Sequence, residues 1–92
     1  MTLALLVLTA AVLAQTAQPA KSAERLALQR GQEAVNNRDF SRARTEFAKA
    51  VRLAPNDAEA QSALGWVLAQ QGELDAAVSH LKAAIKLSLI HI

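Results

Sequence analysis

A chain of 92 residues is long enough for one small domain. Its formal net charge is only +2 and its acidic and basic residues are mixed, so nothing in the charge pattern favours nucleic-acid binding. The absence of cysteine excludes disulfides and thiol chemistry. Aromatic residues make up 3% of the chain, so a folded core must consist mainly of Ala and Leu.

The chain begins with an apolar segment, LALLVLTAAVLA at residues 3–14, which contains no charge. It is shorter than the roughly 20 residues that a helix needs to span a bilayer. Val12 and Ala14 are small residues at the two positions that a signal peptidase recognises, and the polar sequence QTAQPA follows. We therefore interpret residues 1–14 as a signal peptide, with residue 20 as its outer limit, and expect an exported, periplasmic or secreted protein.

Two alternatives to a cleaved signal remain open. Met1 and Thr2 supply no Lys or Arg, which a signal peptide usually has before its apolar segment. If uncleaved, the segment would anchor the protein in a membrane, and no other part of the chain is expected to contact one. In a cytosolic protein the same segment would be a buried helix.

Downstream, the spacing of apolar residues predicts four helices, over residues 24–37, 41–54, 57–70 and 75–86. Gly31 lies inside the first of them, where it costs about 1 kcal/mol relative to Ala. Close packing against the partner helix would offset that cost. Pro55 ends the second helix, and Asn56 with Glu59 resembles a capping box that begins the third.

The downstream part of the chain repeats itself at a fixed spacing. The equivalent pairs include Gly31 and Gly65, Asp39-Phe40 and Glu73-Leu74, Ala43 and Ala77, Phe47 and Leu81, and Ala50 and Ala84. Each pair is 34 residues apart, as 65 − 31 shows for the two glycines. A fixed period of this length indicates stacked helical repeats. We therefore predict an all-α fold of tandem antiparallel helix–turn–helix repeats, an α-solenoid with two repeats.

These residues resemble the tetratricopeptide repeat. The first repeat, residues 24–57, has the family's residue types at Ala27, Gly31, Ala34, Asp39-Phe40, Ala43, Phe47, Ala50 and Pro55. The second, incomplete repeat, residues 58–87, has them at Leu64, Gly65, Leu68, Glu73-Leu74, Ala77, Leu81 and Ala84. Arg30 and Gln61 depart from the family pattern, as does the lack of a Pro after the second repeat. Arg30 is reasonable on the uncovered edge of a first repeat, because terminal repeats act as polar caps.

The resemblance implies a scaffold that binds a protein or peptide segment in a concave groove lined by the first helix of each repeat. By position, the groove residues are Arg25, Gln29, Gln32, Asn36, Glu59, Ser62, Trp66 and Gln70. Trp66 is the expected anchor, with packing between helices as the alternative role for its ring. The family's carboxylate clamp uses Lys and Asn where this chain has Leu28, Gln32 and Ala63, so carboxylate recognition is not expected.

No catalytic constellation accompanies the repeats. The sequence has no His/Cys/Asp/Glu cluster with metal-ligand spacing and no Gly-rich phosphate loop, so we expect no enzyme, cofactor or metal site. His80 stands alone and is interpreted as a solvent-facing or packing residue. We interpret the remaining acids as exposed helix charges and turn residues, namely Glu24, Glu33, Asp39 and Glu46.

The last six residues, LSLIHI, break the repeat pattern, because Leu89 stands where the first repeat has Pro55. They are also one translation of CTGTCTCTTATACACATC, which resembles the transposase end sequence used to build sequencing libraries. We therefore interpret residues 87–92 as a non-native, adaptor-encoded tail, with an unusual natural terminus as the alternative.

If the tail is not native, more repeats are expected in the natural protein. The chain would then be either an exported binding scaffold or the N-terminal accessory part of a longer envelope enzyme or assembly machine. Val78, Leu81 and Ile85 form an apolar stripe on the last helix that only a further helix would cover. Self-association through this helix is therefore a further expectation.

Overall fold

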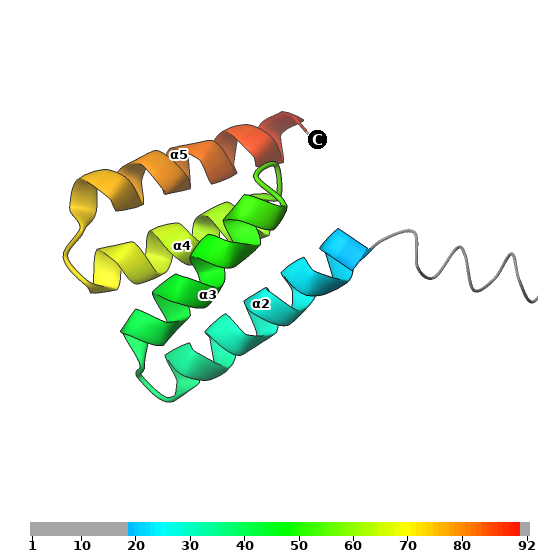
Figure 1. The fold of residues 1–92 in the computed structure, drawn as a ribbon. Helices are drawn as coiled ribbons and strands as arrows, with labels where there is room; N and C mark the ends of the chain where they lie inside the picture. Colours follow the sequence, from blue (N-terminus) through cyan, green and yellow to red (C-terminus); the bar gives the residue numbers. More distant parts are fainter. Residues whose placement is uncertain (1–18, 91–92) are drawn as a thin grey trace, which may run out of the picture.

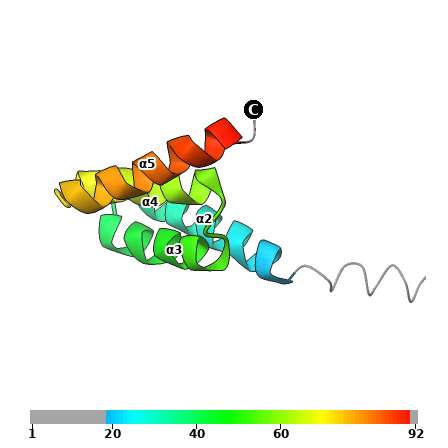
Figure 2. The same cartoon turned by 90° about the horizontal axis from the view of Figure 1, so that it is seen from above.

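The computed structural model describes residues 19–90, which form four α-helices without a strand. The helices are α2 (Pro19–Asn36), α3 (Phe40–Leu53), α4 (Ala58–Gln70) and α5 (Leu74–Ile90). They form two antiparallel hairpins, α2 with α3 and α4 with α5, and α4 packs on α3 (Figure 1). Figure 2 shows the second hairpin stacked on the first. The predicted all-α architecture is confirmed.

Two parts of the sequence interpretation lie outside the described residues, namely the signal peptide at 1–14 and the last two residues of the proposed tail. Within residues 19–90, none of the helices combines the length and the apolar character needed to cross a membrane.

The outer ends of the first and last helices extend beyond the predicted bounds. α2 begins at Pro19 rather than at Glu24, because Pro suits the first helical position, where its missing N–H would have no partner. α5 continues past Lys86 to Ile90, because residues 87–90 contain no Gly or Pro that would end a helix.

The N-cap of α4 is Asp57, so the capping box predicted at Asn56 is wrong. The N–H of Asp57 donates to the carbonyl of Ala54 at 3.1 Å and closes a turn through Pro55. This turn places Asp57 directly before the first helical residue. Its carboxylate accepts a hydrogen bond from the N–H of Glu59 at 3.0 Å, which satisfies one of the free donors at the helix start.

The turns inside the two hairpins have the same backbone structure. In the first turn, the N–H groups of Asp39 and Arg38 donate to the carbonyls of Ala34 and Val35 at 2.8 and 2.9 Å. The second turn repeats both hydrogen bonds at the equivalent positions, at 2.9 and 3.1 Å. Together they form the Schellman motif, which ends a helix with one residue at positive φ. That residue is Arg38 in the first turn (φ 58°) and Gly72 in the second (φ 80°).

The core consists mostly of small side chains, as the composition predicted. Its buried apolar residues are Ala27, Ala34, Ala43, Phe47, Ala50, Ala60, Leu64, Val67, Leu68, Ala77 and Ala84. The two helical glycines let the partner helices approach closely. A Cβ at Gly31 would overlap the Phe47 ring, and a Cβ at Gly65 would lie 2.8 Å from Leu81 Cγ.

Gln61 is a buried polar residue where the family usually has a large side chain. Its Nε2 donates to the carbonyl of Pro55 at 2.9 Å, and its Oε1 lies 2.7 Å from His80 Nδ1. Because an amide oxygen only accepts, Nδ1 of His80 must carry a hydrogen. Gln61 therefore connects the loop between the repeats to α5, and His80 is a half-buried packing residue.

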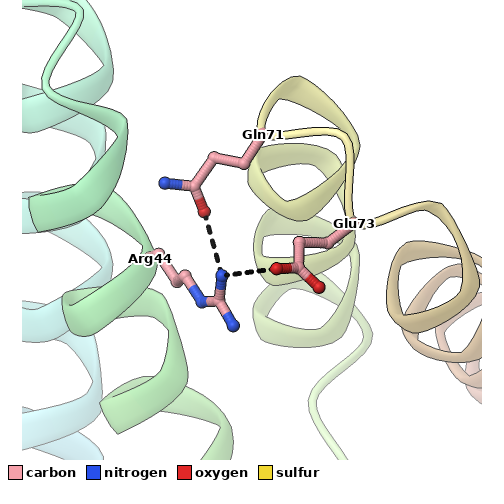
Figure 3. A network of polar contacts seen from close by, with 3 residues as sticks. All are labelled: Arg44, Gln71 and Glu73. Carbon is pink, nitrogen blue, oxygen red and sulfur yellow. Dashed lines mark hydrogen bonds and ion pairs between the residues drawn. The ribbon is translucent and has the colours of Figure 1, made fainter.

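Arg44 makes a polar contact between the two hairpins (Figure 3). Its Nη1 donates to Gln71 Oε1 at 3.3 Å and lies 3.6 Å from Glu73 Oε1. The side chains of Arg44 and Glu73 are about half exposed, at 46% and 54%. Solvent screening limits such a pair to at most about 1 kcal/mol, so apolar packing remains the main attachment of α4 to α3.

Candidate functional site

α2 and α4 form the two walls of an open groove of about 420 Å³. In each helix the lining side chains are three or four residues apart and therefore share one face. The lining consists of Arg25, Leu28, Gln29 and Gln32 from α2, Glu59, Ser62 and Ala63 from α4, and Phe47 from α3. Arg25, Gln29, Gln32 and Glu59 are exposed, so their polar groups are accessible to a ligand.

A second cavity of about 380 Å³ continues this groove. The two share Gln32, Phe47, Ser62 and Ala63, and the second adds Val35, Trp66 and Leu81. These three added side chains are apolar, unlike those of Arg25, Gln29 and Glu59 in the first cavity. The combined groove, called the α2–α4 groove below, therefore has a polar half and an apolar half.

The structure places six of the eight predicted groove residues in this lining, namely Arg25, Gln29, Gln32, Glu59, Ser62 and Trp66. The other two, Asn36 and Gln70, are exposed but line neither cavity. Asn36 has an indirect role, because its Oδ1 accepts a hydrogen bond from Gln32 Nε2 at 3.2 Å. Asn36 lies one helical turn from Gln32, and this bond orients the Gln32 amide.

Trp66 combines the two roles considered for it. Its ring meets that of Phe40 edge to face, with the centroids 6.0 Å apart and the planes at 65°. Such aromatic pairs stabilise packing beyond their buried area. The residue is nevertheless 44% exposed and lines the apolar half of the groove. The Phe40 contact thus orients a ring that stays accessible to a ligand.

The apolar floor of the groove was missed from the sequence. Phe47 and Leu81 lie beside Gly31 and Gly65, where the missing Cβ leaves their side chains reachable from the groove. The equivalence of the two glycines in the repeat pattern could have predicted this floor from the sequence. Val35 had no signal, because its place in the same lining as Trp66 depends on the angle between the hairpins.

The interpretation of Glu24 as an exposed helix charge is wrong. Glu24 is buried, with 7% of its surface exposed, and its Oε1 has no N–H or O–H donor. A hydrogen bond to the Asp57 carboxyl, burial, and the negative charges of Asp57 and Glu59 raise the pKa of Glu24 to about 7, against a small opposing effect of Arg25. Glu33 and Asp39 are exposed as expected, whereas Glu46 is half-buried.

The described residues include no group of three His, Cys, Asp or Glu side chains that could hold a metal ion. The arrangement offers hydrogen-bonding groups, an exposed aromatic ring and an apolar floor. Such groups can hold a ligand by hydrogen bonds and apolar contacts.

Two stacked helical hairpins that repeat the same packing contacts, with a groove between their first helices, define a tandem helical-repeat scaffold. The tetratricopeptide repeat family model matches residues 28–88, and the chain belongs to this family. No curated protein and no solved structure matches it significantly. Tetratricopeptide repeats are typically non-catalytic and mediate contacts between proteins, so the chain is a protein-interaction scaffold.

Proposed function

We propose that the chain binds an extended peptide segment in the α2–α4 groove. The observation that supports this most is the continuity of the groove, with amide and hydroxyl groups in one half and apolar side chains in the other. Gln29 and Gln32 can donate to and accept from the main chain of an extended peptide. Ser62 Oγ donates its hydrogen to the carbonyl of Glu59 at 3.0 Å and can accept from the peptide. A large apolar side chain of the peptide would enter the half lined by Val35, Trp66 and Leu81.

Trp66 is the proposed anchor, because half-exposed aromatic side chains beside a cavity commonly supply much of the binding free energy. Its ring is already held by Phe40, and the Gln32 amide is held by Asn36. These two contacts reduce the side-chain ordering that binding requires at Trp66 and Gln32, which favours affinity.

The test begins with selection of random peptides on the immobilised full chain. Trp66 is the only tryptophan in the sequence, so a blue shift of its fluorescence on titration with a selected peptide reports occupancy of the groove. Trp66→Ala should then weaken binding at least about 30-fold in a fluorescence-polarisation assay, and Gln32→Ala should weaken it several-fold.

Gln70→Ala is the matched control, because Gln70 is an exposed residue of α4 outside the groove lining. It should bind like the unmodified chain. Helical content, measured by circular dichroism, must be unchanged in all three variants. Normal binding by both groove variants, or loss of the fold in Trp66→Ala, would show that the groove assignment is wrong.

We also propose that the protein is exported. The support is in the sequence alone: the apolar segment 3–14 is too short for a spanning helix, and Val12 and Ala14 match a cleavage site. N-terminal sequencing of the protein from the cell-envelope fraction should give a start near Gln15. An intact Met1 on a soluble cytosolic product would contradict export.

A further inference from the structure

α5 carries an apolar face that no other described helix covers. Leu74, Val78, Leu81 and Ile85 are spaced by four, three and four residues, so they form one stripe along the helix. Leu74, Val78 and Ile85 are 63%, 48% and 61% exposed. The same stripe continues toward Leu89, which is also exposed.

The first hairpin shows what such a face requires. Phe47 and Val51 in α3 are equivalent to Leu81 and Ile85 in α5, and α4 packs on α3. Phe47 is buried and Val51 is half-buried, whereas Leu81 is only half-buried and Ile85 is exposed. The α5 face therefore lacks a covering helix of the kind that α4 provides.

Covering this face with the α2 of a second copy would be unfavourable. The α4 residues that pack on the first hairpin include Ala60, Leu64 and Val67, which are all buried. Their equivalents in the first repeat are Leu26, Arg30 and Glu33, which are exposed. Head-to-tail stacking would desolvate Arg30 and Glu33, and burying two charges costs several kcal/mol unless they are well paired.

The charges beside the stripe fit a different arrangement, in which the second copy presents its own α5. The four-three-four spacing is that of a coiled-coil seam. Asp75 and Lys82 lie two helical turns apart on the same exposed flank of this seam. If two α5 helices run antiparallel, with Leu74 opposite Ile85 and Val78 opposite Leu81, Asp75 of each copy lies near Lys82 of the other.

A parallel pairing of the same helices lacks this charge match. In a parallel pair, the side of the seam with Asp75 and Lys82 would lie against the opposite side of the seam in the second helix. That side has Ala77 and Ala84, which are buried and carry no charge. The antiparallel pairing instead forms two equivalent contacts between opposite charges, as a twofold axis requires.

We propose that a second copy of this chain covers the exposed face of α5 in an antiparallel, twofold pairing of α5 with α5. The pairing uses Leu74, Val78, Leu81 and Ile85 as its seam and two Asp75–Lys82 contacts to fix its direction and register. The seam and the α2–α4 groove share Leu81, whereas Asp75, Lys82 and Ile85 do not line the groove. Substitutions at these three positions therefore test the pairing without changing the groove lining.

Sedimentation velocity of the full chain over a concentration series tests this proposal. The unmodified chain should form dimers, and Ile85→Asp should weaken dimerisation at least about 100-fold. Leu26→Asp is the matched control, because Leu26 is an exposed apolar residue on α2, and it should dimerise like the unmodified chain. A chain that begins at Gln15, measured in parallel, should show the same differences between variants.

Charge exchange tests the direction of the pairing. Asp75→Lys and Lys82→Asp should each weaken the dimer about tenfold, because each places like charges together at both contacts. The double variant should regain the affinity of the unmodified chain. An equimolar mixture of the two single variants should also dimerise, because both contacts then join opposite charges. One contact joins the two substituted residues, and the other joins the unchanged Lys82 of one copy to the unchanged Asp75 of the other.

Three results would overturn the proposal. A monomer throughout the concentration series would show that no second copy covers α5. Dimers lost through Leu26→Asp rather than Ile85→Asp would place the interface elsewhere. Charge variants that neither weaken the dimer alone nor restore it together would exclude the antiparallel register.

Discussion

Gly31 and Phe47 are in direct contact, because the missing Cβ of Gly31 leaves the space that the Phe47 ring occupies. In an open helix, Gly31→Ala would add about 1 kcal/mol of helix stability. Here the added methyl group would push the buried ring out of place, and overpacking of a core typically costs about 1–3 kcal/mol. We expect Gly31→Ala to lower the free energy of unfolding, measured by urea denaturation.

Gly65→Ala is the informative comparison for Gly31→Ala. The new Cβ would meet Leu81 Cγ at 2.8 Å and the carbonyl oxygen of Ala77 at 3.2 Å. Leu81 is only half-buried, so its side chain can turn outward. The loss should therefore be smaller than for Gly31→Ala. An equal or greater loss of stability in Gly65→Ala would show that the loss does not depend on how easily the neighbouring side chain, Phe47 or Leu81, can move.

Arg38 is predicted to be a strained residue that glycine can relieve. It has φ 58° at the position where the second turn has Gly72 at φ 80°. A left-handed conformation costs a residue with a side chain roughly 1–2 kcal/mol, which Arg38→Gly would recover. Part of that gain in stability is offset by the greater entropy that glycine has in the unfolded chain. Arg38→Gly should therefore raise the free energy of unfolding by roughly 0.5–1 kcal/mol.

Two further variants separate this backbone effect from the charge of Arg38. Arg38→Ala removes the charge but keeps the strain, so it should give no comparable gain. Gly72→Ala should lower the free energy of unfolding by about 1 kcal/mol or more, although no atom lies within 4 Å of the new methyl group. Stabilisation by Arg38→Ala equal to that by Arg38→Gly would contradict the backbone explanation.

The protonation of Glu24 should make folding stability depend on pH. Its pKa is raised to about 7 in the folded protein, from 4.5, chiefly by the Asp57 carboxyl and by burial. The folded state therefore binds the proton more tightly than the unfolded state, and the resulting stabilisation is complete below about pH 4.5. It is lost as the pH rises through about 7.

The measurement is the free energy of urea unfolding at intervals between pH 4.5 and pH 8. Glu24→Gln is the control, because an amide resembles the protonated carboxyl and does not titrate in this range. The free energy of unfolding of the unmodified chain should fall relative to that of Glu24→Gln as the pH rises. A constant difference would show that Glu24 keeps its ordinary pKa.

The side chain of Gln61 should contribute measurably to stability. Gln61→Ala removes two hydrogen bonds and leaves the Pro55 carbonyl and His80 Nδ1 without this partner. A loss of about 1–3 kcal/mol in urea unfolding is expected. His80→Ala removes only one of the two bonds and should cost less. An equal or larger effect of His80→Ala would contradict the central role given to the Gln61 amide.

The fold was predictable because its information is repeated along the chain. Gly31 and Gly65, like Ala43 and Ala77, mark the same packing contacts in the two repeats, so each repeat supports the interpretation of the other. The helix ends were less certain, because Asp57 rather than Asn56 is selected by a turn through Pro55 that sequence spacing does not specify.

The candidate site was only partly predictable. The polar lining followed from the positions of the family's groove residues, as Gln29, Gln32 and Ser62 show. The burial of Glu24 beside Asp57 depends on how the second hairpin stacks on the first, and no local pattern encodes this contact between distant residues. The aromatic pair of Phe40 and Trp66 is a tertiary contact of the same kind.

The two walls of the α2–α4 groove belong to different hairpins, α2 to the first and α4 to the second. The angle between the hairpins therefore determines the width of the groove. A change in that angle of the hinge kind would open or close the whole groove at once. Any ligand that contacts both walls would hold the angle fixed. Arg44→Ala removes a contact between the hairpins outside the groove, so a change of ligand affinity in this variant would show that the angle controls binding.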